Sequence, residues 1–359
     1  MENTIWTQQQ NRTGRITFHL KTSNRPIDID LLQTLHRDLA RMAEDESIDL
    51  VIMDRAATAR DFCASQGAKT LSLAGRYIGD AATKYLETYL RICHLIATYP
   101  KPIVSIIDGA TVAESAGFAL LSSHQVVTER ARLWFPETSF GSIPSAGASR
   151  ILSRLEGEIG AWLVLTGARL SGADIYAAGL ATHYSSSNNL SNLISALQNS
   201  GLHALDACHT DREFSFEEHR TEINHVFSGK CANQIKFRLE RGSTWAKSQA
   251  TKFAARSPLS IKIALRLLRT SEYLDSTREA LKLEYRALSR LVQSRNFREG
   301  VRAAFEDMDY WPAWKPNSVF NVTYDMVSEY FTPLRDGELD LTDKARLKSR
   351  LLAREAAPA

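Results

Sequence analysis

Apolar residues follow two distinct patterns in the first fifty residues of the chain. Between residues 27 and 43 they recur at helical spacing, at Ile29, Leu32, Leu35, Leu39 and Met42. The flanking segments 12–20 and 47–54 carry short apolar runs that are typical of buried strands. A strand, a helix and a strand in succession predict a parallel pair of strands joined by a right-handed crossover. The pattern therefore predicts an α/β architecture.

The central stretch, residues 101–150, combines strand patterns with candidate chemistry. Apolar β-branched runs at 103–107 and 125–128 predict two further buried strands. Between them, the small residues of 109–121 suit a tight turn that leads into a closely packed helix. Glu137 then presents one carboxylate, before a loop rich in glycine, proline and serine. A strand, the N–H groups at a helix N-terminus and a nearby carboxylate are components of an acyl-transfer site.

Helical spacing dominates the rest of the chain. An amphipathic helix is predicted at 81–97, before Pro100, and shorter ones at 159–165 and 172–178. Six further helices are predicted at residues 190–199, 215–227, 244–255, 259–270, 276–294 and 297–305. We therefore predict three parts: an α/β core at 1–187, a helical region at 188–335 and a basic tail at 336–359.

Composition and charge exclude several classes of protein. The chain has 359 residues, of which 44% are apolar and 24% charged, and this balance is typical of a globular protein with a large core. A net charge of +3 is too small to indicate nucleic-acid binding on its own. No apolar run approaches the roughly 18 residues that span a bilayer, so we expect no membrane partner. The four cysteines form no paired motif, which favours a reducing compartment.

Three other groups of residues are candidates for a functional role. Candidate metal ligands are Cys208, His209, His219, His225 and Cys231. Their spacing fits no zinc module, so no metal site is predicted. The glycines of the central stretch do not form a phosphate-binding loop, because the GxxxxGK[ST] pattern is absent. Trp311 and Trp314 are expected to pack a terminal loop and not to stack on nucleotides.

The end of the chain is basic. Its cations include Lys344, Arg346, Lys348 and Arg350, and the pattern is that of a basic amphipathic helix. Two interpretations remain open for it. The segment is either a solvated terminal helix or a contact with RNA or another acidic surface.

Several sequence blocks match a known family. They are RDFCA at 60–64, KPIVSIIDGATV at 101–112, FPETSFGSIPSAGAS at 135–149, LTGARLSGADIYAAGLATHY at 165–184, SPLSIKIALRLL at 257–268, LEYR at 283–286, FREGVRA at 297–303 and WKP at 314–316. Together they resemble the crotonase (enoyl-CoA hydratase/isomerase) superfamily, and within it the 3-hydroxyisobutyryl-CoA hydrolase branch. The resemblance implies a crotonase-type ββα spiral core with a helical C-terminal region. It also implies self-association, a coenzyme A thioester as ligand and no other cofactor.

The resemblance assigns roles to particular residues. In the family, two backbone N–H groups form an oxyanion hole for the thioester oxygen. One would come from the loop containing Ala64 and Ser65, and the other from the turn containing Glu114 and Ser115. Glu137 occupies the place of the family's catalytic Glu. A following Pro-Asp motif normally supplies the second carboxylate.

The chain departs from the family pattern at three of these four elements. The FCAGGD loop becomes Phe62-Cys63-Ala64-Ser65-Gln66-Gly67, and the glycine-rich turn contains Glu114. A carboxylate within about 4 Å of a developing oxyanion costs several kcal/mol at low effective dielectric. Ser145 stands where the hydrolases carry Asp, and no base lies beside it in sequence to activate it as a nucleophile. Glu137 is then either a retained acid/base or a carboxylate that caps the following turn.

Two functions follow from the resemblance. The branch includes protein subunits of the mitochondrial small ribosomal subunit. The first prediction is therefore a catalytically degraded protein of the mitochondrial matrix that contacts ribosomal proteins, and rRNA through its basic tail. The alternative is an active 3-hydroxyisobutyryl-CoA hydrolase of valine catabolism. Glu114 directed into an acyl-CoA pocket would favour the first, and an open tunnel beside Glu137 would favour the second.

Overall fold

The computed structural model describes residues 4–19, 27–56, 59, 63–64, 79–112, 114–208, 214–335 and 337–342. At positions 63, 64, 79, 80 and 114 only the backbone is described. Within these ranges, no helix has the length and apolar character needed to cross a membrane. Of the predicted basic tail, residues 337–342 are described, whereas Lys344, Arg346, Lys348 and Arg350 lie outside the described residues.

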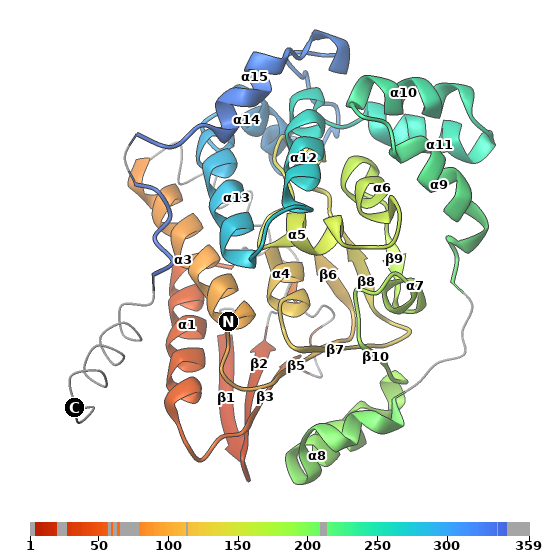
Figure 1. Ribbon diagram of the computed structural model, residues 1–359. Helices are drawn as coiled ribbons and strands as arrows, with labels where there is room; N and C mark the ends of the chain where they lie inside the picture. The colour runs from red at the N-terminus through yellow and green to blue at the C-terminus, as the bar shows by residue number, and fades with distance from the viewer. Residues whose placement is uncertain are drawn as a thin grey trace, which may run out of the picture.

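A six-stranded sheet forms the centre of the molecule (Figure 1). Its order is β1 (Thr4–Gln10), β2 (Thr13–His19), β3 (Leu50–Arg55), β5 (Ile103–Ile107), β7 (His124–Val127) and β10 (His183–Tyr184). β1 and β2 form an antiparallel hairpin, and all the other neighbours are parallel. All five residues of β5 are buried, as expected for a central parallel strand covered on both faces.

A second sheet of four short strands lies beside the first. It contains β4 (Cys63–Ala64), β6 (Ala110–Val112), β8 (Arg132–Trp134) and β9 (Leu170–Ser171). β3 and β4, β5 and β6, and β7 and β8 are consecutive pairs, and each pair contributes one strand to each sheet. Helices α3 (Gly79–Ala97), α4 (Glu114–Leu120) and α5 (Ala148–Ser153) come after the three pairs. This repetition is a ββα spiral, and the predicted fold class is confirmed.

Helices cover both faces of the large sheet. On one face, the apolar stripe of α1 (Ile29–Glu44) is buried at the predicted positions Leu32, Leu35 and Leu39. Asp28 caps this helix by accepting a hydrogen bond from the Leu31 amide at 2.8 Å. On the other face, α8 (Leu190–Ser200) joins residues of β3, β5 and β7 in a separate smaller cluster.

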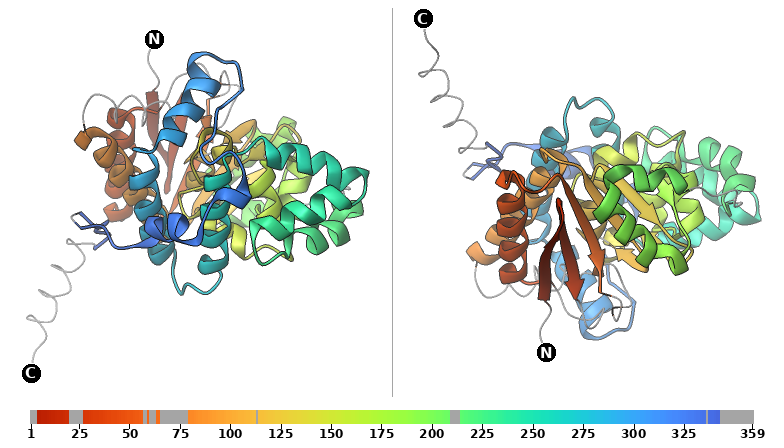
Figure 2. Two further views of the ribbon diagram at one scale, coloured as in Figure 1. Left: turned by 90° about the horizontal axis from the view of Figure 1, so that it is seen from above. Right: turned by 90° about the horizontal axis from the view of Figure 1, so that it is seen from below.

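From residue 190 onward, the described chain forms helices and no strands. After α8, the α-helices of the described residues are α9 (Arg220–Phe227), α10 (Ala232–Arg241), α11 (Thr244–Ala254), α12 (Pro258–Ser271), α13 (Thr277–Leu291), α14 (Arg295–Val301) and α15 (Tyr324–Ser328). Helices α9 to α11 project to one side as a lobe, whereas α12 to α14 lie against the core (Figures 1 and 2). The main hydrophobic cluster includes residues from before and after position 187.

Candidate functional site

Glu137 begins a short 3₁₀ helix, η1 (Glu137–Phe140), directly after β8. Its side chain is almost completely buried, with 5% of its surface exposed. The turn that follows is closed by the amides of Gly141 and Ser142, which donate to the main-chain oxygen of Glu137. The main-chain oxygen of Glu137 is therefore fixed by the turn.

Arg256 places a positive charge near Glu137. Burial lowers the pKa of the Arg256 guanidinium, and the Glu137 carboxylate acts in the opposite direction by favouring its charged form. One guanidinium nitrogen of Arg256 donates to the Thr166 main-chain oxygen at 2.5 Å. A Cβ at Gly167 would lie 2.8 Å from this nitrogen, so the missing side chain makes room for it. The Glu137 carboxylate thus lies in a buried environment with a cationic neighbour.

The helical C-terminal region packs against the turn that contains Glu137. The Ser257 amide, which precedes α12, donates to the Thr138 main-chain oxygen at 2.9 Å. Gly300 of α14 lies directly against the Phe140 backbone, where any Cβ would overlap it. At Gly141, φ is +74° and a Cβ would lie 2.5 Å from the Asn296 main-chain oxygen. Both glycines are therefore required by close approach of the two segments.

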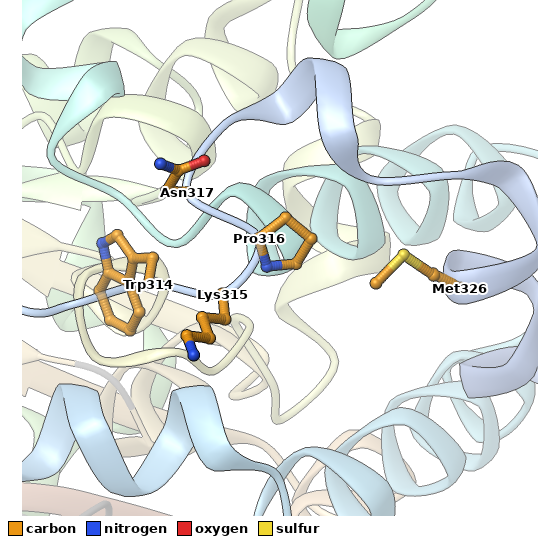
Figure 3. Close-up of a pocket in the computed structure, with 5 residues that line it drawn as sticks. All are labelled: Trp314, Lys315, Pro316, Asn317 and Met326. Atoms are coloured by element: carbon orange, nitrogen blue, oxygen red, sulfur yellow. The ribbon is translucent and has the colours of Figure 1, made fainter.

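Asn296 also connects this turn to the WKP block. Its side-chain amide donates to the Lys315 main-chain oxygen at 2.8 Å, and its oxygen accepts from the Lys315 amide at 2.9 Å. An open pocket of about 540 Å³ is lined by Trp314, Lys315, Pro316, Asn317 and Met326. In Figure 3, the side chain of Met326, which belongs to α15, points toward Pro316 across the pocket.

Ser145 lies in the loop between η1 and α5, and it is 8% exposed. The loop has left-handed backbone at Ala146 (φ 63°) and Gly147 (φ 77°). Gly117 of α4 packs against Ala146 so closely that a Cβ at Gly117 would overlap it. The structure therefore places Ser145 next to the helix that begins at Glu114.

A buried carboxylate from α13 fixes this loop. Glu284 is fully buried and accepts hydrogen bonds from the Gly147 amide at 2.8 Å and from the Ser149 amide at 3.1 Å. Burial raises the pKa of Glu284 to about 7, although the hydrogen bonds from Ser149 and Gly147 act in the opposite direction. The loop that carries Ser145 is thus held by a residue of the helical region.

The small sheet brings together the two strands that precede the candidate oxyanion segments. β4 pairs with β6 in parallel, with Ala64 opposite Val112. The Ser115 hydroxyl is completely buried, donates to the Val112 main-chain oxygen at 2.7 Å and accepts from the Val112 amide at 3.0 Å. This hydroxyl stabilises the turn before α4. Ser65 lies outside the described residues, and Glu114 is described by its backbone alone.

A buried ionic cluster lies at the carboxyl end of β5. Asp108 accepts hydrogen bonds from Arg130 at 2.6 and 2.8 Å and from the Thr128 hydroxyl at 2.6 Å, and it also pairs with Arg55. Burial raises the pKa of the Asp108 carboxyl, but Arg130, Thr128 and Arg55 together hold it below its ordinary value. Arg55 also donates to the main-chain oxygens of Ala56 and Ala59. The cluster therefore ties β5 to the chain that leaves β3.

Some sequence predictions concern residues away from Glu137. No three His, Cys, Asp or Glu side chains in the described ranges are arranged to hold a metal ion. Trp314 packs as predicted, with 8% of its surface exposed. The same prediction is wrong for Trp311, which is 83% exposed. Sequence reasoning gave no role to Arg256, Asp108 or Glu284, although Glu284 is the acid of the LEYR block.

Comparison with known proteins adds a family to this geometry. A family model described as Enoyl-CoA hydratase/isomerase matches residues 13–331. The chain is 31% identical over 350 residues to the mitochondrial 3-hydroxyisobutyryl-CoA hydrolase of Gallus gallus, covering 93% of this chain and 90% of that protein. It is 33% identical over 348 residues to the mitochondrial enzyme of the same name from Rattus norvegicus, covering 92% and 89%.

Solved structures with the same architecture include two enzymes of coenzyme A thioesters. A carnitinyl-CoA dehydratase from Mycobacterium thermoresistibile superposes with a TM-score of 0.89 at 27% identity, covering 95% of this chain and 99% of that one. An enoyl-CoA hydratase from Rhodobacter sphaeroides 2.4.1 superposes with a TM-score of 0.86 at 30% identity, covering 92% and 97%.

Proposed function

This chain belongs to the enoyl-CoA hydratase/isomerase family, and from that premise we propose that it keeps the hydrolase fold without hydrolysing thioesters. The observation that carries the proposal is Ser145, which replaces the expected Asp within an ordered and buried loop. Hydrogen bonds from Gly147 and Ser149 to Glu284 hold that loop in place. The loop is therefore held in place, but it lacks the carboxylate that the family carries there.

A serine cannot replace this carboxylate in proton transfer. Its hydroxyl is neutral at physiological pH, so it does not accept a proton from water unless another group acts as base. The retained Glu137 supplies one carboxylate where the family uses two. General acid–base catalysis typically contributes about 10²–10⁴-fold in rate, and the loss of one partner removes much of that factor.

The oxyanion segments also support loss of catalysis. Two glycines that would follow Ala64 are Ser65 and Gln66, and Glu114 replaces a glycine in the second segment. The Ser115 hydroxyl hydrogen-bonds to the Val112 backbone and stabilises the turn, so it does not replace a main-chain N–H donor. One lost or misplaced donor in an oxyanion hole lowers the rate by about 10²–10³.

We place this protein in mitochondria as a structural component of the small ribosomal subunit. Relatives that match nine-tenths of the chain are named mitochondrial, which supports the compartment. The ribosomal role rests on the resemblance to a branch that includes such ribosomal proteins. The basic residues Lys344, Arg346, Lys348 and Arg350 add charge suited to rRNA and ribosomal partners.

The decisive experiment is a thioesterase assay. Purified protein and its Glu137→Gln variant are incubated with 3-hydroxyisobutyryl-CoA, and free thiol is followed with a chromogenic disulfide. We expect equal background rates from the two proteins. Turnover in the common enzyme range of about 1–10³ per second, lost in the variant, would overturn the proposal. Mitochondrial lysate is then sedimented, and the protein is expected with the small ribosomal subunit at low salt.

A second candidate function is hydrolysis of 3-hydroxyisobutyryl-CoA, as the names of the relatives indicate. The observation that favours it is the buried Glu137 beside Arg256, in a turn that contacts two C-terminal segments, Ser257 before α12 and helix α14. This candidate requires an acyl-CoA to bind, whereas the first does not. Turnover in the assay above, with protein absent from ribosomal fractions, would establish it.

A further inference from the structure

Three exposed aromatic side chains each carry a cation against the ring. Arg241 lies 3.6 Å above Phe237, Arg266 lies 5.3 Å from the ring of Tyr324, and Lys236 lies 5.9 Å from that of Phe320. The rings are 53%, 75% and 60% exposed, respectively. We name these six residues the cation–aromatic face.

The six residues lie on three neighbouring helices and the 3₁₀ helix between them. Lys236 and Phe237 are neighbours on α10, and Lys236 reaches Phe320 in the short 3₁₀ helix η6 (Val319–Asn321). The Lys262 ammonium of α12 donates to the Val322 main-chain oxygen at 2.6 Å, which fixes the segment after η6. Arg266, one turn further along α12, faces Tyr324 of α15. These contacts run from α10 across α12 to α15, along the upper side of Figure 1.

The surrounding segment is strongly basic. Residues 230–269 contain ten lysines and arginines and one acid, Glu240, in a chain whose net charge is only +3. Lys236 pairs with Glu240, and Arg269 pairs with Glu158. Within the ranges that the structure describes, no carboxylate lies within ion-pair distance of Arg241, Lys262 or Arg266. Arg241, Lys262 and Arg266 therefore contribute positive charge that no ion pair in the described residues compensates.

We infer that the cation–aromatic face binds single-stranded RNA. Phosphates are attracted to unpaired cations, and each base has a planar face that stacks on an exposed aromatic ring. An acidic protein surface would use the cations but has no need of three exposed rings. Base-paired RNA would likewise leave the rings unused, because its bases are stacked within the helix. Alternating rings and cations suit an unpaired strand.

This inference deepens the proposed function, because it names the surface with which the folded part of the chain would meet ribosomal RNA. It does not depend on the basic tail, which every variant below retains. It also does not depend on loss of hydrolysis. RNA binding at this face and thioesterase activity at Glu137 are measured separately, so one can fail while the other stands.

The test is fluorescence anisotropy with the full chain and a labelled 12-nucleotide oligouridylate. The variants are Phe237→Ala, Tyr324→Ala and Arg241→Gln, at exposed positions whose truncation removes little core packing. We expect each aromatic variant to bind about ten- to a hundredfold more weakly. Arg241→Gln should reduce the slope of log affinity against log salt by about 1. Trp6→Ala and Arg37→Gln, exposed at the opposite end of the fold, are the matched controls and should bind normally.

Competitors distinguish the class of ligand. Polyglutamate and a 12-base-pair RNA duplex are each added to the preformed complex, and neither should displace the oligouridylate at equal phosphate or carboxylate concentration. Displacement by the duplex would show that the rings do not stack on unpaired bases, and would overturn the inference. Displacement by polyglutamate would assign the face to an acidic protein and overturn the inference. Unchanged binding by all three variants, or no binding by the unaltered chain at low salt, would also overturn it.

Discussion

Glu284 and Ser149 form two hydrogen bonds with each other although 135 positions separate them in the chain. The Glu284 carboxylate accepts from the Ser149 amide at 3.1 Å and from its hydroxyl at 2.6 Å. The same hydroxyl accepts from Ser271 of α12 at 3.0 Å. Two helices of the C-terminal region thus meet beside the loop that carries Ser145. This region therefore helps to form the candidate site.

Replacing Glu284 by Gln should change how stability depends on pH. The folded-state pKa of Glu284 is about 7, above its ordinary value of 4.5, so the folded state holds this proton more tightly than the unfolded chain. The free energy of unfolding therefore falls as the pH rises from about 4.5 to 7, by about 3 kcal/mol in total, and levels off above it. The Glu284→Gln variant should lack this component. Urea unfolding at half-unit pH intervals measures it, and parallel pH profiles for the two proteins would contradict it.

Gly300→Ala should destabilise the protein through the Glu137 turn. A methyl group at position 300 overlaps the Phe140 backbone, so α14 and η1 must separate. Overpacking of this kind costs about 1–3 kcal/mol. The control is Gly179→Ala, where nothing lies within 4 Å and only the left-handed backbone at φ +76° is strained. Thermal unfolding followed by circular dichroism should show the larger loss for Gly300→Ala, and equal losses would show that steric overlap is not the cause.

The α/β character of the core could be predicted from sequence because its signals are local, whereas the ββα spiral was implied by the family resemblance. The apolar run Ile103–Ile107 predicts a buried strand with the observed bounds, and the stripe of α1 predicts its buried face. β1 was not predicted, because Thr4–Gln10 is mostly polar and its strand conformation depends on pairing with β2. The predicted boundary near residue 187 marks the change to helices, yet the main hydrophobic cluster continues across it.

The candidate site was predicted less completely. Glu137 and Ser145 lie in local motifs, so the sequence places them in neighbouring loops. Arg256 and Glu284 lie on distant helices, and their position beside these loops depends on how α12 and α13 pack. Sequence periodicity treats such charged residues as exposed. A fully buried acid such as Glu284 is recognised only when its amide partners are located in three dimensions.

Ser115→Ala should cost stability and test the role given to this hydroxyl. The variant leaves the buried Val112 amide without the Ser115 oxygen at 3.0 Å, and an unsatisfied buried group costs about 1–3 kcal/mol. Ser115→Thr, which keeps a hydroxyl, should recover part of the loss. Guanidinium unfolding measures both variants. If Ser115→Ala were as stable as the unaltered chain, the turn before α4 would not depend on this side chain.

Asp108→Asn should be the most destabilising single change at the carboxyl end of β5. The carboxylate is 3% exposed and compensates Arg55, whose side chain is also mostly buried, together with Arg130. Removing one partner of a buried pair leaves an uncompensated charge and costs about 3–5 kcal/mol. Asp49→Asn is the matched control, because Asp49 pairs with Arg12 at the surface, where solvent screens the charges and the pair contributes little to stability. Urea unfolding at pH 7 should separate the two variants clearly.

The pH dependence of the same cluster gives an independent check. Because the folded-state pKa of Asp108 lies below its ordinary value of 3.8, its stabilising effect is fully present above that pH. The effect is lost as the pH falls through the depressed folded-state value, since protonation then removes the charge that Arg130 and Arg55 require. Acid unfolding of the unaltered chain should therefore include this loss, whereas Asp108→Asn should approach the unaltered chain in stability as the pH falls below 3.8. A constant difference between the two proteins down to the acid-unfolded state would show that the charge of Asp108 is not what stabilises the cluster.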